Sequence, residues 1–213
     1  MVDARASDAP EPVVRNALRT LFWLTLAGSV VSLLSSGPFV LLIPQLASTG
    51  PFATALLGLV INVLAIVTFA EIARQRGARR FWVALGLMVA PNALWLLNLG
   101  LRFAGFPLLD LPLGSLRLAN PLSLTQSLLA AAANIALWLA LATLVPRYPP
   151  RWMTVVFSIG AVTMALGGSG IFYGLALVAL GPLVFALYPL WLVPPVLMLV
   201  LLRKLGWRSP ELG

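Results

Sequence analysis

The chain has 213 residues and contains neither cysteine nor histidine. Without thiols it forms no disulfides and has no thiolate chemistry. Without imidazoles as well, it lacks the ligands of typical zinc sites and of haem held by His or Cys. Acidic side chains are also scarce, with six Asp and Glu against 14 Lys and Arg. We therefore expect no metal site and no cofactor.

Charge of either sign is rare in this chain. Charged residues make up 9% of it and hydrophobic residues 61%, against about 25% and roughly 45–50% in ordinary soluble domains. A soluble protein of this size needs a polar exterior, which such a composition does not supply. The solvent must be lipid, and the composition predicts an all-α, polytopic membrane bundle, because spanning helices satisfy their own backbone hydrogen bonds.

Long apolar stretches divide the chain into predicted helices. A bilayer core about 30 Å thick needs about 20 apolar residues of helix. Six stretches reach that length and are predicted to be transmembrane helices: 20–42, 52–73, 81–101, 123–145, 152–174 and 177–202. The predicted transmembrane domain spans residues 20–202, between a disordered cytoplasmic tail at 1–19 and a second cytoplasmic tail at 203–213.

The basic residues indicate the orientation, because Lys and Arg concentrate in cytoplasmic loops. With six helices and a cytoplasmic N-terminus, twelve of the 14 basic residues fall on the cytoplasmic side. The other two, Arg102 and Arg117, lie in segment 102–120, which is too apolar for a free loop and too rich in proline for a long helix. We expect this segment to be interfacial or re-entrant. Both termini should be cytoplasmic, and the chain should lie in the plasma (inner) membrane.

The formal net charge of +8 would suggest nucleic acid as the partner of a soluble protein. Here the basic residues flank apolar segments, so we assign them to topology and to anionic lipid headgroups, and we expect no nucleic acid. Glu71 lies three residues before Arg74, a spacing that predicts an ion pair at a helix end. The predicted headgroup contacts are Arg74, Arg76, Arg79 and Arg80.

Amide side chains lie near the centres of three predicted helices. An amide in hydrocarbon is costly unless it is hydrogen-bonded, so these side chains should face the interior of the bundle. There they either bond to a neighbouring helix or line a ligand cavity, and Gln126 would extend such a cavity toward the outside. The candidate ligand-binding residues are Asn62, Asn92, Asn134 and Gln126.

Small residues recur at every fourth position on the first and fifth predicted helices, which allows close approach of helices. Packing within the chain and a docking surface for another membrane subunit, or for a second copy, both fit this pattern. The predicted packing residues are Gly28, Ser32, Ser36, Ala161, Ala165, Ser169, Gly170 and Gly174.

Catalytic patterns are weak. The run Gly-Gly-Ser-Gly at 167–170 resembles the GxSG serine motif of rhomboid intramembrane proteases. Those enzymes pair the serine with a histidine, which this chain lacks, so we assign no catalytic residue and expect no enzyme. No ionisable group lies at mid-membrane depth, which argues against a proton-driven pump.

Three functions remain open. The leading hypothesis is a non-catalytic membrane subunit, either a small-solute permease or a substrate-binding component, in which the asparagines bind an uncharged or weakly polar ligand. The second is a structural or assembly subunit of a larger membrane complex, packed through its small residues. The third is a lipid-modifying enzyme at the outer interface, using Asp110, Arg102 or Arg117.

Overall fold

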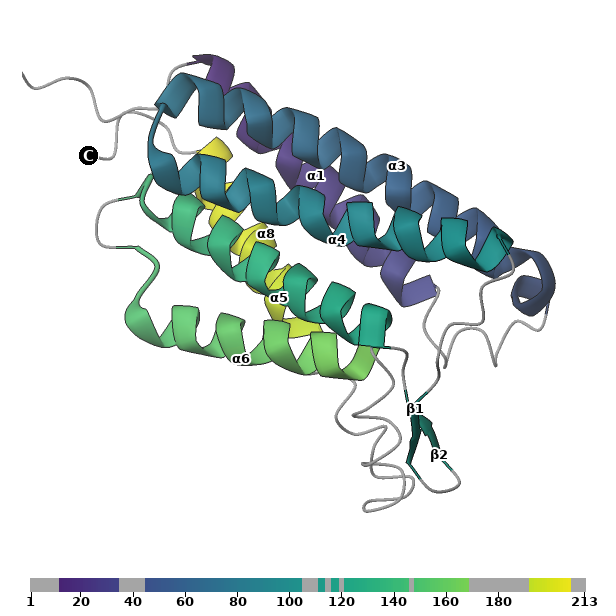
Figure 1. Ribbon diagram of the computed structural model, residues 1–213. Coiled ribbons are helices and arrows are strands. Elements are labelled where there is room, and N and C mark those ends of the chain that lie inside the picture. The colour runs from purple at the N-terminus through teal and green to yellow at the C-terminus, as the bar shows by residue number, and fades with distance from the viewer. Residues whose placement is uncertain are drawn as a thin grey trace, which may run out of the picture.

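The computed structural model describes residues 12–34, 45–104, 111–113, 116–118, 121–145, 148–168 and 192–207. These residues form a six-helix bundle with one short β-hairpin at its end, which confirms the predicted all-α bundle (Figure 1). The helices are α1 (Pro12–Leu34), α3 (Gln45–Arg76), α4 (Arg79–Phe103), α5 (Pro121–Ala142), α6 (Arg151–Gly168) and α8 (Val193–Gly206). The strands are β1 (Leu111–Leu113) and β2 (Leu116–Leu118).

Three of the described helices are long and apolar enough to cross a membrane. They supply the candidate spans Leu56–Arg76, Arg79–Leu101 and Leu124–Ala142, and α6 adds a shorter apolar helix at Arg151–Leu166. The helix α8 has 14 residues, and residues 169–191 of the last two predicted spans lie outside the described part. The chain is thus a candidate multi-pass helical membrane protein with three candidate spans among its described residues.

The outer surface of the bundle is apolar. Val67 on α3 and Ile159 on α6 are each 62% exposed, and Leu97 on α4 is 53% exposed. Similar exposed valines and leucines continue along the same helices. Large apolar surfaces of this kind are unfavourable in water and are normal where lipid is the solvent, so the surface agrees with the composition.

The helix boundaries differ from the predicted ones mainly at the starts of helices. Helix α1 begins at Pro12 instead of Thr20, so the part of the expected tail from residue 12 onward is helical. Proline suits a first helical position, and Val14 and Leu18 bury an apolar face that continues into the basic segment. Helix α3 begins at Gln45.

The outer segment 102–120, which we expected to be interfacial or re-entrant, contains a short hairpin. Strands β1 and β2 pair antiparallel, with Leu111 opposite Leu118 and Leu113 opposite Leu116. The extended backbone suits Pro112, whose ring is incompatible with a helix interior. Arg117 pairs with Pro112 in this hairpin.

The helices alternate in direction, so the described cationic side chains gather at one end of the bundle, here named the basic end (Figure 1, left). The hairpin lies at the other end, named the hairpin end (Figure 1). Exposed tryptophans also lie near the basic end, with Trp23 at 60% and Trp152 at 62% exposure. The cationic side chains there are Arg15, Arg19, Arg74, Arg76, Arg79, Arg80, Arg151, Arg203 and Lys204.

Specific contacts hold the basic end together. Arg19 Nε donates a hydrogen bond of 2.9 Å to the carbonyl oxygen of Gly206, which joins α1 to the end of α8. Lys204 Nζ lies 3.7 Å from the ring centroid of Tyr148, a cation–π geometry. The predicted ion pair at the end of α3 is confirmed, with 2.9 Å between Arg74 Nη2 and Glu71 Oε1.

The core of the bundle lies in the half next to the basic end. Trp138 on α5 is fully buried, and its ring stacks on Phe157 of α6 with the centroids 4.5 Å apart. Its Nε1 donates a 3.1 Å hydrogen bond to Thr154 Oγ1, which satisfies the buried indole. Phe69 of α3 packs against Phe81 of α4 at 5.9 Å. Buried aromatic side chains therefore fill much of the space between the helices in this half.

Candidate functional site

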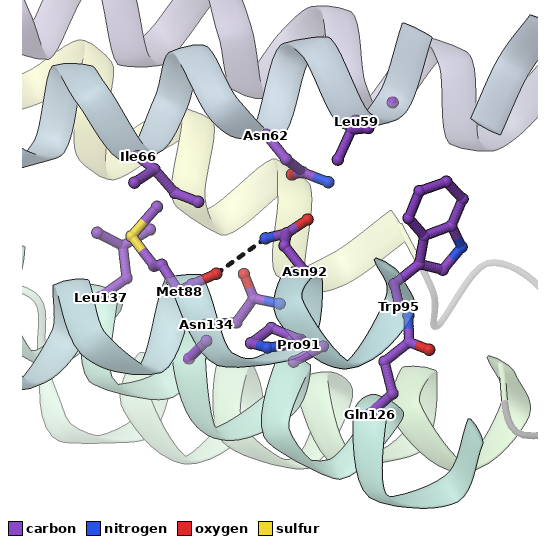
Figure 2. Close-up of a pocket in the computed structure, with 13 residues that line it drawn as sticks. Leu59, Asn62, Ile66, Met88, Pro91, Asn92, Trp95, Gln126, Asn134 and Leu137 are labelled. Atoms are coloured by element: carbon purple, nitrogen blue, oxygen red, sulfur yellow. Dashed lines mark hydrogen bonds between the residues drawn. The ribbon is translucent and has the colours of Figure 1, made fainter. Parts of the chain in front are cut away.

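A cavity with a volume of about 290 Å³ lies between α3, α4 and α5 (Figure 2). Each helix contributes residues at spacings of one, three or four positions, so the cavity is bounded by one face of each helix. All four predicted ligand-binding amides line it. The lining residues are Gly58, Leu59, Asn62, Ile66, Met88, Pro91, Asn92, Trp95, Gln126, Ala130, Ala133, Asn134 and Leu137.

Small and apolar residues shape the cavity. Gly58 on α3 and Ala130 and Ala133 on α5 occupy lining positions where longer side chains would fill the space. Ile66 on α3 and Leu137 on α5 line its apolar part. Figure 2 shows Ile66, Met88 and Leu137 together on one side and Trp95 and Gln126 on the other. The cavity is therefore apolar toward the basic end and polar toward the hairpin end.

Asn92 is fixed by its own helix. Its Nδ2 donates a 2.9 Å hydrogen bond to the carbonyl oxygen of Met88, one turn earlier on α4 (Figure 2). The preceding residue, Pro91, lies inside the helix and has no N–H to donate. One amide proton of Asn92 is thus used, while its carbonyl oxygen and second proton remain available to the cavity.

The other amides of the cavity make no hydrogen bond among the described residues. Asn62 from α3 and Asn134 from α5 are directed to the same space as Asn92 (Figure 2). None of the hydrogen bonds of the described residues involves the side-chain amides of Asn62, Asn134 or Gln126, and Asn62 and Asn134 are exposed. Each amide offers two donors and an acceptor, so the cavity presents both kinds of group to a ligand or to water.

The lining carries no charge, since no Lys, Arg, Asp or Glu is among the lining residues of the described chain. An ion that entered would lose its hydration without gaining an opposite charge, which is strongly unfavourable. A neutral molecule would exchange its hydrogen bonds with water for bonds to the amides. The electrostatics of the cavity therefore favour a neutral ligand.

The cavity lies at a depth where polar groups are rare in membrane proteins. Asn92 is near the middle of the candidate span Arg79–Leu101, and Asn134 is near the middle of Leu124–Ala142. Asn62 lies within the third span, Leu56–Arg76. Polar residues at mid-span usually face the interior of a bundle and mark functional positions.

The residues predicted for helix packing have mixed positions. Ala161 and Ala165 on α6 are buried, so they are used for packing within the chain. A β-carbon on Gly28 would make an ordinary 3.5 Å contact with Ile61 of α3, whereas Ser32 is exposed. The remaining predicted packing residues lie outside the described residues, and they are Ser36, Ser169, Gly170 and Gly174.

Two residues that matter for packing and polarity were not predicted. Gly160 on α6 lies so close to Pro194 of α8 that a β-carbon would be 2.7 Å from the ring. Asn98 on α4 is buried at 8% exposure. The small residues at 160, 161 and 165 could have indicated that α6 packs closely against another helix at Gly160. The spacing of Asn98 from Pro91 and Trp95 could have indicated that Asn98 lies on the same face of α4 as these two residues.

The residues proposed for an outer-interface enzyme form no described cluster. Arg102 lies near the end of α4 and Arg117 in β2, while Asp110 lies outside the described residues. Among the described residues, no group of three or more acidic side chains is placed to hold a metal ion. The cavity between α3, α4 and α5 is therefore the site on which a function can be argued.

Comparisons with known proteins give no relative for this chain. No protein-family model matches it, and neither the curated proteins nor the solved structures contain a match. A function for this chain therefore has to be argued from its cavity, its surface and its charge distribution alone.

Proposed function

We propose that the protein is a non-catalytic multi-pass membrane protein that binds a small neutral polar solute, as a permease or as a substrate-binding subunit. The binding site is the cavity between α3, α4 and α5. The observation that carries this proposal is the convergence of Asn62, Asn92, Asn134 and Gln126 on one uncharged cavity near mid-span.

The chemistry of the lining defines the ligand class. Amides accept and donate hydrogen bonds equally, so they suit solutes that carry both hydroxyl or amide donors and carbonyl or hydroxyl acceptors. The side chains of Trp95 and Met88 supply apolar contact next to these groups. A few convergent polar groups in an otherwise apolar lining are typical of small-molecule sites. The volume of about 290 Å³ restricts the ligand to a small molecule.

The proposed topology has six transmembrane helices with both termini cytoplasmic, in the plasma (inner) membrane. It is supported by the cationic side chains and exposed tryptophans that share the basic end. Single cysteines in the cysteine-free chain test it. Gln75→Cys should react with a membrane-impermeant maleimide only after cells are opened, and Ser48→Cys should react in intact cells. The reverse pattern would overturn the topology. Gly77 is unsuitable because its φ of 62° strains any side chain.

The basic turn between α3 and α4 is proposed to contact anionic lipid headgroups. Arg76, Arg79 and Arg80 are exposed there, and among the described residues Glu71 pairs only with Arg74 and Gln75. Each basic side chain near an anionic surface contributes about 1 kcal/mol. These contacts would hold the turn at the membrane surface whatever the direction of transport. They therefore concern the location of the protein and not its ligand.

The binding proposal is tested with an asparagine variant and a matched control. Wild type, Asn62→Leu and Asn16→Leu are purified gently from native membranes, and the small molecules that accompany them are identified by mass spectrometry. Asn16 is exposed on α1 and does not line the cavity. A compound retained by wild type and Asn16→Leu but lost from Asn62→Leu supports the proposal.

A transport measurement gives the second readout. Vesicles that contain each variant are mixed with urea, glycerol or acetamide, and light scattering reports the rate at which each solute enters. Faster entry of one of these solutes into wild-type vesicles should be lost in Asn62→Leu and kept in Asn16→Leu. Identical compounds in all three preparations, together with identical entry rates, would contradict the solute-binding proposal.

A further inference from the structure

Asn98 on α4 is buried and incompletely hydrogen-bonded. It is 8% exposed, and across the described residues its Oδ1 has no hydrogen-bond partner. A buried acceptor without a partner costs about 1–3 kcal/mol. Such a cost is avoided when water or a ligand occupies the space beside the oxygen.

Asn98 shares a helix face with the cavity. Pro91, Trp95 and Asn98 follow each other at spacings of four and three residues, so they lie on the same side of α4. Pro91 and Trp95 line the cavity, and the lipid-facing side of α4 is marked by Leu96 and Leu97, which are 51% and 53% exposed. Asn98 therefore continues the inner, cavity-lining face one turn beyond Trp95, toward the hairpin end.

Apolar side chains bound the cavity in the opposite direction. Toward the basic end it is bounded by Ile66, Met88 and Leu137, and beyond these lie Phe69 and Trp138, which are fully buried in the core. The indole of Trp138 offers a polar molecule no free donor, because it already bonds to Thr154. Toward the hairpin end, α5 contributes Gln126 beside Trp95 (Figure 2), and α4 contributes Asn98.

We propose that a hydrated route leads from the hairpin end along the inner face of α4 to the cavity, passing Asn98 and Trp95. In this route Asn98 Oδ1 accepts a hydrogen bond from water or from the entering solute. The proposal rests on the proposed function, because it supplies the way into the cavity that a solute-binding protein requires. Trp95 stands between the two asparagines of α4, so the solute passes its indole ring.

The absence of native cysteine makes the route testable without knowing the ligand. Asn98→Cys, Asn92→Cys and Leu97→Cys are placed in lipid nanodiscs and treated with a negatively charged methanethiosulfonate. This reagent reacts with the thiolate, which forms readily only where water reaches the sulfur. Burial that raises the thiol pKa by two units lowers the thiolate fraction about 100-fold. We expect Asn98→Cys and Asn92→Cys to react about 100-fold faster than the lipid-facing Leu97→Cys.

The direction of the route is tested in intact cells with the same membrane-impermeant reagent. Asn98→Cys should be modified from outside, whereas Gln75→Cys at the basic end should be modified only after the cells are opened. Gln126→Cys on α5 is a second reporter of the same route, so the test does not depend on folding of one variant. Modification of Asn98→Cys only in opened cells would overturn the proposal.

The remaining outcomes separate the route from the binding site. If Asn92→Cys reacts while Asn98→Cys and Gln126→Cys do not, the route is wrong and the solute-binding cavity stands. If all three are as slow as Leu97→Cys, the route is wrong and the hydrated cavity on which the proposed function depends is contradicted as well. If all three react quickly and Leu97→Cys does not, the route is supported.

Discussion

Replacing Gly160 with alanine tests how closely α6 and α8 pack. A β-carbon at this position would lie 2.7 Å from Cγ and 3.0 Å from Cδ of Pro194. Non-bonded carbon atoms prefer separations of about 3.5–4.0 Å, so the two helices have to move apart locally by close to an ångström. The ring of Pro194 is rigid and buried at the start of α8, so it cannot rotate away.

The size of the effect follows from two opposing contributions. Overpacking of a core contact costs about 1–3 kcal/mol, while alanine in place of glycine stabilises a helix by about 1 kcal/mol. Gly86→Ala on α4 is the matched control, because its β-carbon meets no atom within 4 Å and it receives the same helix-forming benefit. The two variants should therefore differ in stability by about 1–3 kcal/mol, or roughly 2–12 °C in melting temperature.

The measurement is thermal unfolding in mild detergent, followed by fluorescence of the seven tryptophans. Gly160→Ala should melt below Gly86→Ala. Adding Pro194→Ala removes the ring atoms that meet the new β-carbon, so the penalty of Gly160→Ala should shrink in that background. A Gly160→Ala protein that melts with or above Gly86→Ala would refute the close approach of α6 and α8.

Three further substitutions separate structural from functional contacts. Trp138→Phe removes the hydrogen bond to Thr154 and part of the buried ring, and should lower stability by about 1–3 kcal/mol in the same unfolding assay; an unchanged melting temperature would show that this bond is dispensable. Glu71→Gln breaks an exposed ion pair with Arg74 and should leave the melting temperature unchanged. Gly58→Leu should fill the cavity from α3, because a β-carbon there meets no atom within 4 Å. It should abolish ligand retention without loss of stability, and normal retention would place the ligand elsewhere.

Much of the architecture could be predicted from the sequence because lipid imposes simple rules. Apolar length and flanking arginines located α4 and α5 to within a few residues, and the spacing of Glu71 and Arg74 predicted their ion pair. The start of α1 was misplaced, since the arginines of its first turns obscured a buried face formed by residues such as Val14 and Leu18. Basic residues mark where a predicted membrane span ends, but the helix can continue beyond them, as α1 does.

The cavity itself could be predicted only in part. Depth along each helix follows from the count of residues, so Asn62, Asn92 and Asn134 were expected at a common level, and all three line the cavity. Their convergence depends on how α3, α4 and α5 rotate about their axes, which is decided by packing between helices. Asn98 was missed because it lies near the end of its span, where an asparagine also suits the membrane interface.

The hydrogen bonds of the described helices help to distinguish two roles for the asparagines, which are to line a ligand cavity or to join neighbouring helices. Hydroxyls on these helices bond to carbonyl oxygens within their own helix, as Ser29 does to Thr25 and Thr68 to Leu64. Asparagines whose role was only to join helices would bond to a side chain or carbonyl of the neighbouring helix. In contrast, no hydrogen bond of the described residues joins the amides of Asn62 and Asn134 to another helix, and both residues are exposed at the cavity, where water or a ligand can bond to them. The amides that line the cavity are therefore better explained by a ligand site than by adhesion between helices.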